Sequence, residues 1–184
     1  MRNRNTLTTG TLALALLLLA GSAAAKEIEG HSYQDELNVG GHQLKLVGVG
    51  LRTKWFFNVY TLGAYSKSGT RSARHLVNTD EPKFIWLRMM RSISAEKMND
   101  AIDEGFEKNT PDGERAAFKE RLDTLKSYMP ATLKKHLHIG FTYRPGEGTL
   151  VTIGKTPKGT IAGADFARGL FSIWFGRKPV DKSL

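Results

Sequence analysis

Apolar and polar residues alternate with a period of two in two stretches of the first half of the chain, residues 43–49 and residues 55–64. Because successive side chains of a β-strand point to opposite faces, we expect each stretch to form a strand. Gly48 and Gly50 permit a reversal of the chain between the strands, since glycine tolerates the backbone angles of tight turns. The pattern therefore predicts a hairpin with Arg52 at its mouth.

The second strand is expected to distribute its side chains over two faces. One face carries Phe56, Asn58, Tyr60 and Leu62, and the other carries Phe57, Val59 and Thr61. Tyr60 would thus share its face with a polar residue. Arg52 stands beside this apolar strand and needs an anion or a hydrogen-bonded partner, because an unpaired buried charge is very costly. The residues alone leave an alternative interpretation open. In it, Arg52 pairs with a carboxylate of a loop and Tyr60 is an ordinary aromatic residue of a strand.

The following segment changes from strand to helix. Pro82 precedes an apolar run at residues 83–90 that is typical of a strand. Ser94 is the expected N-cap of a helix that continues to about Lys108, with Glu96 in its first turn. The apolar residues of this helix are spaced as a core-facing stripe of Met98, Ala101, Ile102 and Phe106.

The rest of the chain predicts two more helices and a meander of strands, so the fold class is α+β. Thr110 and Pro111 begin one helix and Pro130 ends it. From residue 137 the period returns to two, with turns expected at residues 145–148 and 157–159. A last helix begins near Asp165 and ends at Gly176, and its buried stripe is Phe166, Leu170, Ile173 and Trp174.

The N-terminus has the three parts of a secretory signal peptide. Arg2 and Arg4 form a positively charged start, residues 12–20 form an apolar run, and three alanines precede a cleavage site. A noncleaved membrane anchor is the alternative, but the apolar run is much shorter than the ~20 residues that span a bilayer. We expect a cleaved signal peptide at residues 1–25 and one domain at residues 26–184.

Composition narrows the partners of this domain. The chain has no cysteine, which excludes disulfides, a thiol nucleophile and sulfur-ligated metals. Its formal net charge is +9, and removal of Arg2 and Arg4 with the signal peptide leaves +7. This excess of positive charge favours binding of nucleic acid, anionic lipid or a small anionic ligand. Since an exported protein meets no nucleic acid, we expect no nucleic-acid partner, and peripheral contact with an anionic membrane surface stays open.

We expect no cofactor and no metal site. His136 and His138 share one face of a strand, but no carboxylate or third histidine is spaced to complete a metal site. The glycines at Gly48 and Gly50 lack the third glycine of a dinucleotide-binding loop and open no helix.

Four segments keep the order of a known family: G-x-G-x-R ending at Arg52, NVYTLGAY at residues 58–65, FIWLRMMRSISAEKM at residues 84–98, and IAGADFARGLFSIWFG at residues 161–176. On these segments the chain resembles the chalcone isomerase-like superfamily, in its bacterial exported branch. The resemblance implies a curved antiparallel β-sheet covered by helices, an open-faced β-sandwich with a cleft between the layers. Together with the signal peptide, it implies a periplasmic location.

The superfamily contains enzymes, whose catalytic residues can be placed on this chain. In the plant isomerases an arginine orients the substrate while a threonine, a tyrosine and an asparagine handle the ketone and water. Arg52 matches the arginine, but the threonine position falls on Tyr60. The tyrosine and asparagine positions fall near Ser94 and Ala101. The resemblance therefore implies that the electrostatic positioning needed for catalysis is not assembled.

The superfamily also contains fatty-acid-binding proteins, in which an arginine and a tyrosine at the positions of Arg52 and Tyr60 hold the carboxylate. The resemblance implies that the aromatic strand and the C-terminal helix line an acyl tunnel. We expect a noncatalytic binder of a fatty acid or similar amphipathic carboxylate, with Arg52 and Tyr60 as its ligand-binding residues. Two alternatives stay open: an isomerase, or intramolecular lyase, acting on a chalcone-like phenolic enone with Arg52 as its catalytic residue, and a structural or partner-binding protein of the envelope.

Overall fold

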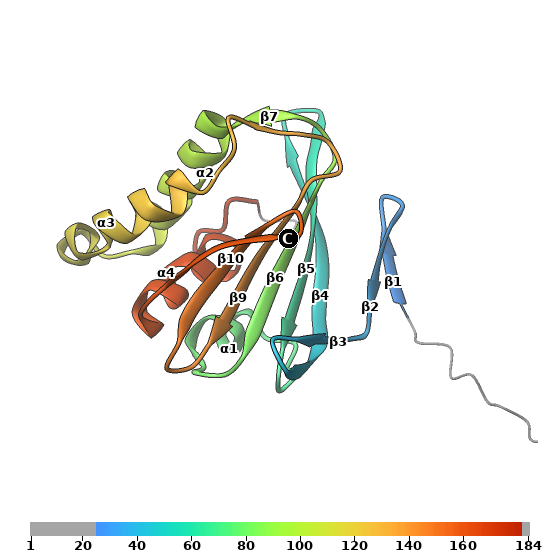
Figure 1. Cartoon of the computed structure of the whole chain (residues 1–184), viewed down its shortest axis with the longest axis horizontal. Helices are drawn as coiled ribbons and strands as arrows, with labels where there is room; N and C mark the ends of the chain where they lie inside the picture. The colour runs from blue at the N-terminus through green and yellow to red at the C-terminus, as the bar shows by residue number, and fades with distance from the viewer. Residues whose placement is uncertain (1–24, 182–184) are drawn as a thin grey trace, which may run out of the picture.

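The computed structural model describes residues 25–181, and its centre is an antiparallel sheet (Figure 1). Its strands are β3 (Glu36–Val39), β4 (His42–Lys54), β5 (Phe57–Ser66), β6 (Lys83–Met89), β9 (His138–Arg144), β10 (Gly148–Ile153) and β11 (Thr156–Ile161). They lie in the order β11-β10-β9-β6-β5-β4-β3, and each neighbouring pair is antiparallel. The sheet is curved and carries helices, so the predicted fold class is confirmed.

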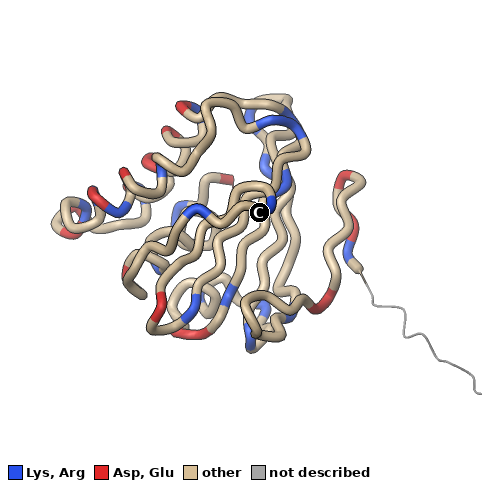
Figure 2. The backbone as a smooth tube through the Cα atoms, viewed as in Figure 1, with Lys and Arg blue, Asp and Glu red and all other residues tan. Residues whose placement is uncertain are grey.

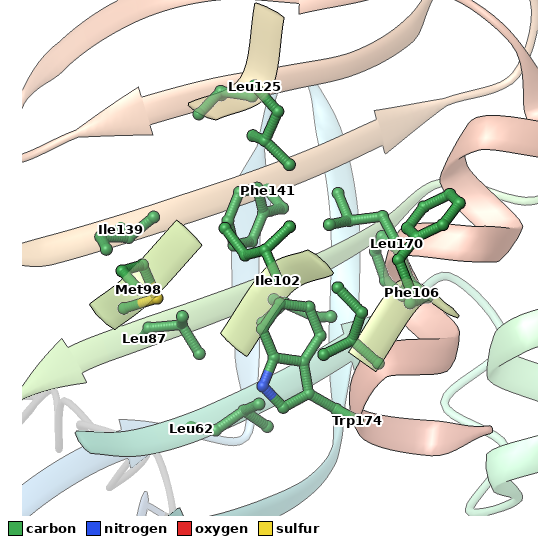
Figure 3. Packing of buried hydrophobic residues seen from close by; sticks show 14 of the residues in the cluster. Leu62, Leu87, Met98, Ile102, Phe106, Leu125, Ile139, Phe141, Leu170 and Trp174 are labelled. Carbon is green, nitrogen blue, oxygen red and sulfur yellow. The ribbon is translucent and has the colours of Figure 1, made fainter. Parts of the chain in front are cut away.

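The helices cover one face of the sheet. They are α1 (Ala73–Asn78), α2 (Ala95–Asn109), α3 (Asp112–Ser127) and α4 (Ala164–Phe175). Helix α4 packs against α1 and α2, and α3 packs against α2. Figure 3 shows the main core between these layers, where Met98 and Ile102 of α2 and Trp174 of α4 lie over Leu87 and Phe141 of the sheet. Burial of this apolar surface is the main stabilising contribution to the fold.

The opposite face of the sheet carries a smaller core. The hairpin of β1 (Ala25–Ile28) and β2 (His31–Gln34) lies over it and buries Tyr33 against Leu44 and Tyr65. Two short strands, β7 (Ile93–Ser94) and β8 (Thr132–Leu133), pair with each other beside α2. Neither small sheet is indicated by the sequence pattern, because strands of two to four residues are too short to show a period.

The predicted reversal at Gly48 and Gly50 is wrong. Strand β4 continues through both glycines to Lys54, and the chain turns at Trp55 and Phe56. Glycine permits a turn but does not require one, and here the apolar alternation on both sides of the glycines favours a continuous strand. The second turn of the C-terminal meander is also displaced, since β11 already begins at Thr156.

The predicted assignment of faces along β5 is wrong at its start. Tyr60 pairs with Arg52 but Asn58 pairs with Thr53, so Val59 is an extra residue, a β-bulge. Val59 and Tyr60 consequently both belong to the main core. Asn58 lies on the opposite face, where its Nδ2 donates to the Glu29 carboxylate at 3.3 Å.

The N-terminal prediction lies outside the described residues, apart from Ala25. Within residues 25–181, no helix is long and apolar enough to cross a membrane.

Candidate ligand-binding site

A cavity of about 520 Å³ lies between the end of the β4–β5 hairpin and the first turns of α2. Its apolar lining is Trp55, Phe57, Val59, Ile93, Met98 and Ala101, and its polar lining is Arg52, Lys54, Tyr60, Arg91, Ser92, Lys97 and Asp100. Arg52, Val59, Tyr60 and Met98 are buried, whereas Lys54, Trp55, Arg91 and Lys97 are exposed. The first group therefore forms the deep end of the cavity and the second group forms its mouth.

The sheet register brings the two residues predicted to bind ligand together. Arg52 on β4 and Tyr60 on β5 are direct cross-strand partners. The bulge at Val59 turns Tyr60 towards the helix layer, where cross-strand side chains on one face approach each other closely. Both residues line the cavity.

Arg52 is a buried cation without a direct ion pair among residues 25–181, and the Glu104 carboxylate acts on it only at longer range. Its side chain is 9% exposed, and its Nη1 donates to the Tyr60 hydroxyl at 3.3 Å. The guanidinium carbon lies 5.7 Å from the centre of the Tyr60 ring. No ion pair joins Arg52 to a carboxylate among residues 25–181. A guanidinium has five N–H donors, so this one retains donors for an anion in the cavity.

The Tyr60 hydroxyl is held from two sides. It accepts the bond from Arg52 and a second bond from Nε1 of Trp174 at 2.8 Å. A phenol oxygen has two acceptor positions and one proton. Because both acceptor positions are engaged, the hydroxyl proton is left to donate to a further acceptor. A carboxylate beside Arg52 would supply that acceptor.

Positive charge surrounds the mouth of the cavity. Lys54, Arg91 and Lys97 line it, with Asp100 as the carboxylate of the lining. The guanidinium carbon of Arg91 lies 4.3 Å from the centre of the Phe57 ring, which holds this cation over the rim. This distribution favours anions over neutral or cationic ligands.

The two positions that the resemblance assigns to catalytic groups have other roles here. Ser94 is the N-cap of α2, as predicted, and its hydroxyl accepts from the Lys97 backbone N–H at 3.3 Å. Ala101 lines the cavity and presents a methyl group to it. Ser94 does not line the cavity, and the Ala101 side chain has no group that could transfer a proton.

Trp174 contacts the candidate site through Tyr60, and the sequence pattern did not indicate this contact. The sequence places it in the buried stripe of the last helix, and it is 3% exposed. The signal that could have revealed it is the indole N–H, which needs a hydrogen-bond acceptor when it is buried. The expectation that the C-terminal helix lines the ligand tunnel is wrong for this cavity, whose walls come from β4, β5, α2 and the segment 91–93.

The prediction that His136 and His138 share one strand face is wrong, because His136 lies in the turn before β9 with a φ of 68° and only His138 belongs to the strand. The His138 ring packs edge-on against Trp86, with 5.3 Å between ring centres. Burial, with a smaller effect of the Arg88 cation, lowers the pKa of His138. Across residues 25–181, no three His, Cys, Asp or Glu side chains gather in a way that could hold a metal ion.

Comparison with known proteins gives two similarities. The sequence profile of a family described as chalcone isomerase-like matches residues 25–184. The crystal structure of a fatty-acid-binding protein from Arabidopsis thaliana superposes with a TM-score of 0.64 at 17% identity, over 86% of this chain and 92% of that one. At this identity the likeness shows a shared fold. No curated protein sequence matches the chain.

Proposed function

The chain belongs to the chalcone isomerase-like family, and on that premise we propose that it is a noncatalytic binder of a fatty acid or a similar amphipathic carboxylate. The family includes more than one kind of activity, so the proposal depends on the site and not on the fold.

The observation that carries the proposal is the state of Arg52. A guanidinium that is 9% exposed and lacks an ion-pair partner in the described chain is costly unless an anion joins it. Arg52 offers N–H donors and Tyr60 offers its hydroxyl proton on the same side of the cavity. A carboxylate has two oxygens and can accept both kinds of hydrogen bond at once.

The rest of the cavity suits an apolar chain. Its volume of about 520 Å³ lies within the roughly 300–1,000 Å³ that is usual for small-molecule sites. Beyond Arg52 and Tyr60, the inner walls are formed by Val59, Ile93 and Met98. The carboxylate would lie at the deep end, and the acyl chain would extend along these walls towards Trp55 and Phe57 at the mouth.

The site argues against an isomerase. The positions that should carry a tyrosine and an asparagine hold Ser94, which is engaged as a helix cap, and Ala101, which has no polar atom in its side chain. The structural neighbour from Arabidopsis is itself described as a fatty-acid-binding protein, which supports the binding reading by analogy. The periplasm remains the proposed location, on the strength of the signal-peptide pattern.

Native mass spectrometry of protein purified without detergent tests the proposal. A copurifying fatty acid, displaced by added palmitate, is the expected result. Turnover of a chalcone by the wild-type protein would instead indicate the isomerase. An empty cavity that takes up no fatty acid on titration would indicate the structural or partner-binding role.

A further inference from the structure

The tip of the β4–β5 hairpin exposes three consecutive aromatic residues. Trp55 is 85% exposed, Phe56 is 96% exposed and Phe57 is 57% exposed. They are the large hydrophobic side chains that residues 25–181 leave exposed. Their clustering at one turn is unusual, because single exposed apolar residues are normal but contiguous ones mark contact sites.

The backbone at this tip is strained at Trp55. Trp55 has φ of 63°, a left-handed conformation that favours glycine and is unfavourable for a bulky residue. Phe56, by contrast, makes no contribution to the lining of the cavity. The strained residue lines the cavity mouth, and the exposed ring of Phe56 beside it serves neither the cores nor the cavity, which suggests a role for this tip outside the fold.

Cations surround the aromatic tip. Lys54 precedes it, Arg91 covers Phe57, and Lys97 lies across the cavity mouth. The loop before β9 adds Lys135, whose backbone N–H donates to Ser92 of the lining at 3.0 Å. Figure 2 shows Lys and Arg gathered at this end of the sheet.

We infer that this aromatic tip, Trp55–Phe57 with Lys54, Arg91, Lys97 and Lys135, docks the protein on an anionic lipid bilayer. Tryptophan and phenylalanine insert at the level of the lipid headgroups, and lysine and arginine are attracted to anionic lipids. A protein partner fits less well. Four cations stand around the three aromatic side chains, whereas the centre of a protein interface is depleted of charged residues and of lysine in particular.

Docking in this way turns the mouth of the cavity towards the membrane. Trp55 and Phe57 belong both to the tip and to the cavity lining. A fatty acid in a bilayer presents its carboxylate to the water and its chain to the interior. It can therefore pass head-first towards Arg52 without reversing its orientation. This last step rests on the proposed function, whereas docking itself does not.

Binding to lipid vesicles tests the docking site. The full-length mature protein is mixed with vesicles of phosphatidylcholine and anionic phosphatidylglycerol, and bound protein is measured by flotation. Phe56→Ser removes an exposed ring that neither the core nor the cavity uses, and it should weaken vesicle binding about tenfold. Fatty-acid binding in solution should be unchanged in this variant.

Two charge variants form a matched pair. Lys135→Glu reverses a charge beside the tip but outside the cavity lining, and it should weaken vesicle binding roughly tenfold. Arg74→Glu makes the same charge change at an exposed position of α1, the helix that follows the opposite end of β5. It should leave vesicle binding close to that of the wild type. Tryptophan fluorescence should also shift to shorter wavelength on vesicle binding, and Trp55→Phe should abolish most of that shift.

Three results would overturn the inference. One is equal binding of wild type and Phe56→Ser to anionic vesicles, and another is equal binding of the wild type to vesicles of phosphatidylcholine alone. The third is a dimer in sedimentation velocity that Phe56→Ser dissociates, since the tip would then join two copies of the chain. A wild-type protein that binds anionic vesicles but takes up no fatty acid would refute the proposed function and leave the docking site unaffected.

Discussion

At the scale of single residues, Arg52 and Tyr60 should contribute unequally to ligand affinity. Arg52→Ala removes charge-assisted hydrogen bonds and should weaken fatty-acid binding by roughly 1.5–3 kcal/mol, about one to two decades in Kd. Tyr60→Phe keeps the ring and removes one neutral hydrogen bond, so it should cost about 0.5–1.5 kcal/mol. Titration with a fluorescent fatty acid measures both. If both variants bind like the wild type, or if Arg52→Ala unfolds the domain, the residues are structural.

Trp55 offers a second test at this scale, because its backbone conformation favours glycine. Trp55→Gly removes a left-handed strain of roughly 1–2 kcal/mol and adds unfolded-state entropy of roughly 0.5–1 kcal/mol. The free energy of unfolding should therefore rise by up to about 1.5 kcal/mol. Phe56→Gly is the matched control: its φ is not left-handed, so this variant should lose stability. If chemical denaturation shows that both variants lose the same free energy of unfolding, the backbone at Trp55 is not strained.

At the scale of elements, Lys83 joins β6 to the end of α1. Lys83 is 1% exposed, and its ammonium group donates to the carbonyl oxygens of Leu76 at 2.7 Å and Thr79 at 3.0 Å. Burial lowers the pKa of Lys83 to about 8 from 10.5, against the opposing effect of the Glu81 and Asp80 carboxylates. The buried charge therefore carries a cost at neutral pH that the helix C-terminus only partly offsets.

This pKa predicts a pH dependence of stability. Between pH 8 and pH 10.5 the unfolded chain keeps the Lys83 proton while the folded chain releases it. Since the unfolded state then binds more protons, the free energy of unfolding should rise with pH in this window, by up to about 3 kcal/mol. Lys83→Met should lack the rise, and Lys158→Met, at an exposed position of β11, should keep it. Urea denaturation at several pH values measures the free energy of unfolding. The same dependence on pH in the wild type and in Lys83→Met would contradict the prediction.

At the scale of the whole molecule, the prediction concerns export. The signal-peptide pattern predicts a mature protein that begins at Lys26 and lies in the periplasm. Its net charge of +7 suits the anionic bilayer surface on which the aromatic tip is proposed to dock. Intact-mass analysis of the exported protein measures the cleavage site. A mass that retains residues 1–25 would show a noncleaved anchor instead.

The elements with strong local signals were predicted well. Helix α2 begins after Ser94 and α4 has the expected buried stripe, because caps and helical spacing are properties of neighbouring residues. The turn after β4 was misplaced. A two-residue turn at Trp55 and Phe56 carries no glycine, asparagine or proline, so the usual turn residues give no signal there.

The sequence by itself determined the α+β class and the family, and it identified Arg52 and Tyr60 as residues of one hairpin, since these follow from local periodicity and from motif order. Only the structure placed Arg52 within β4, as the direct cross-strand partner of Tyr60. The tertiary structure alone decided how the site is built. The bulge at Val59 exists only in the register between β4 and β5, and the Tyr60–Trp174 bond joins residues 114 positions apart. Such features depend on which segments meet in three dimensions, and the spacing of residues along one chain carries no record of that.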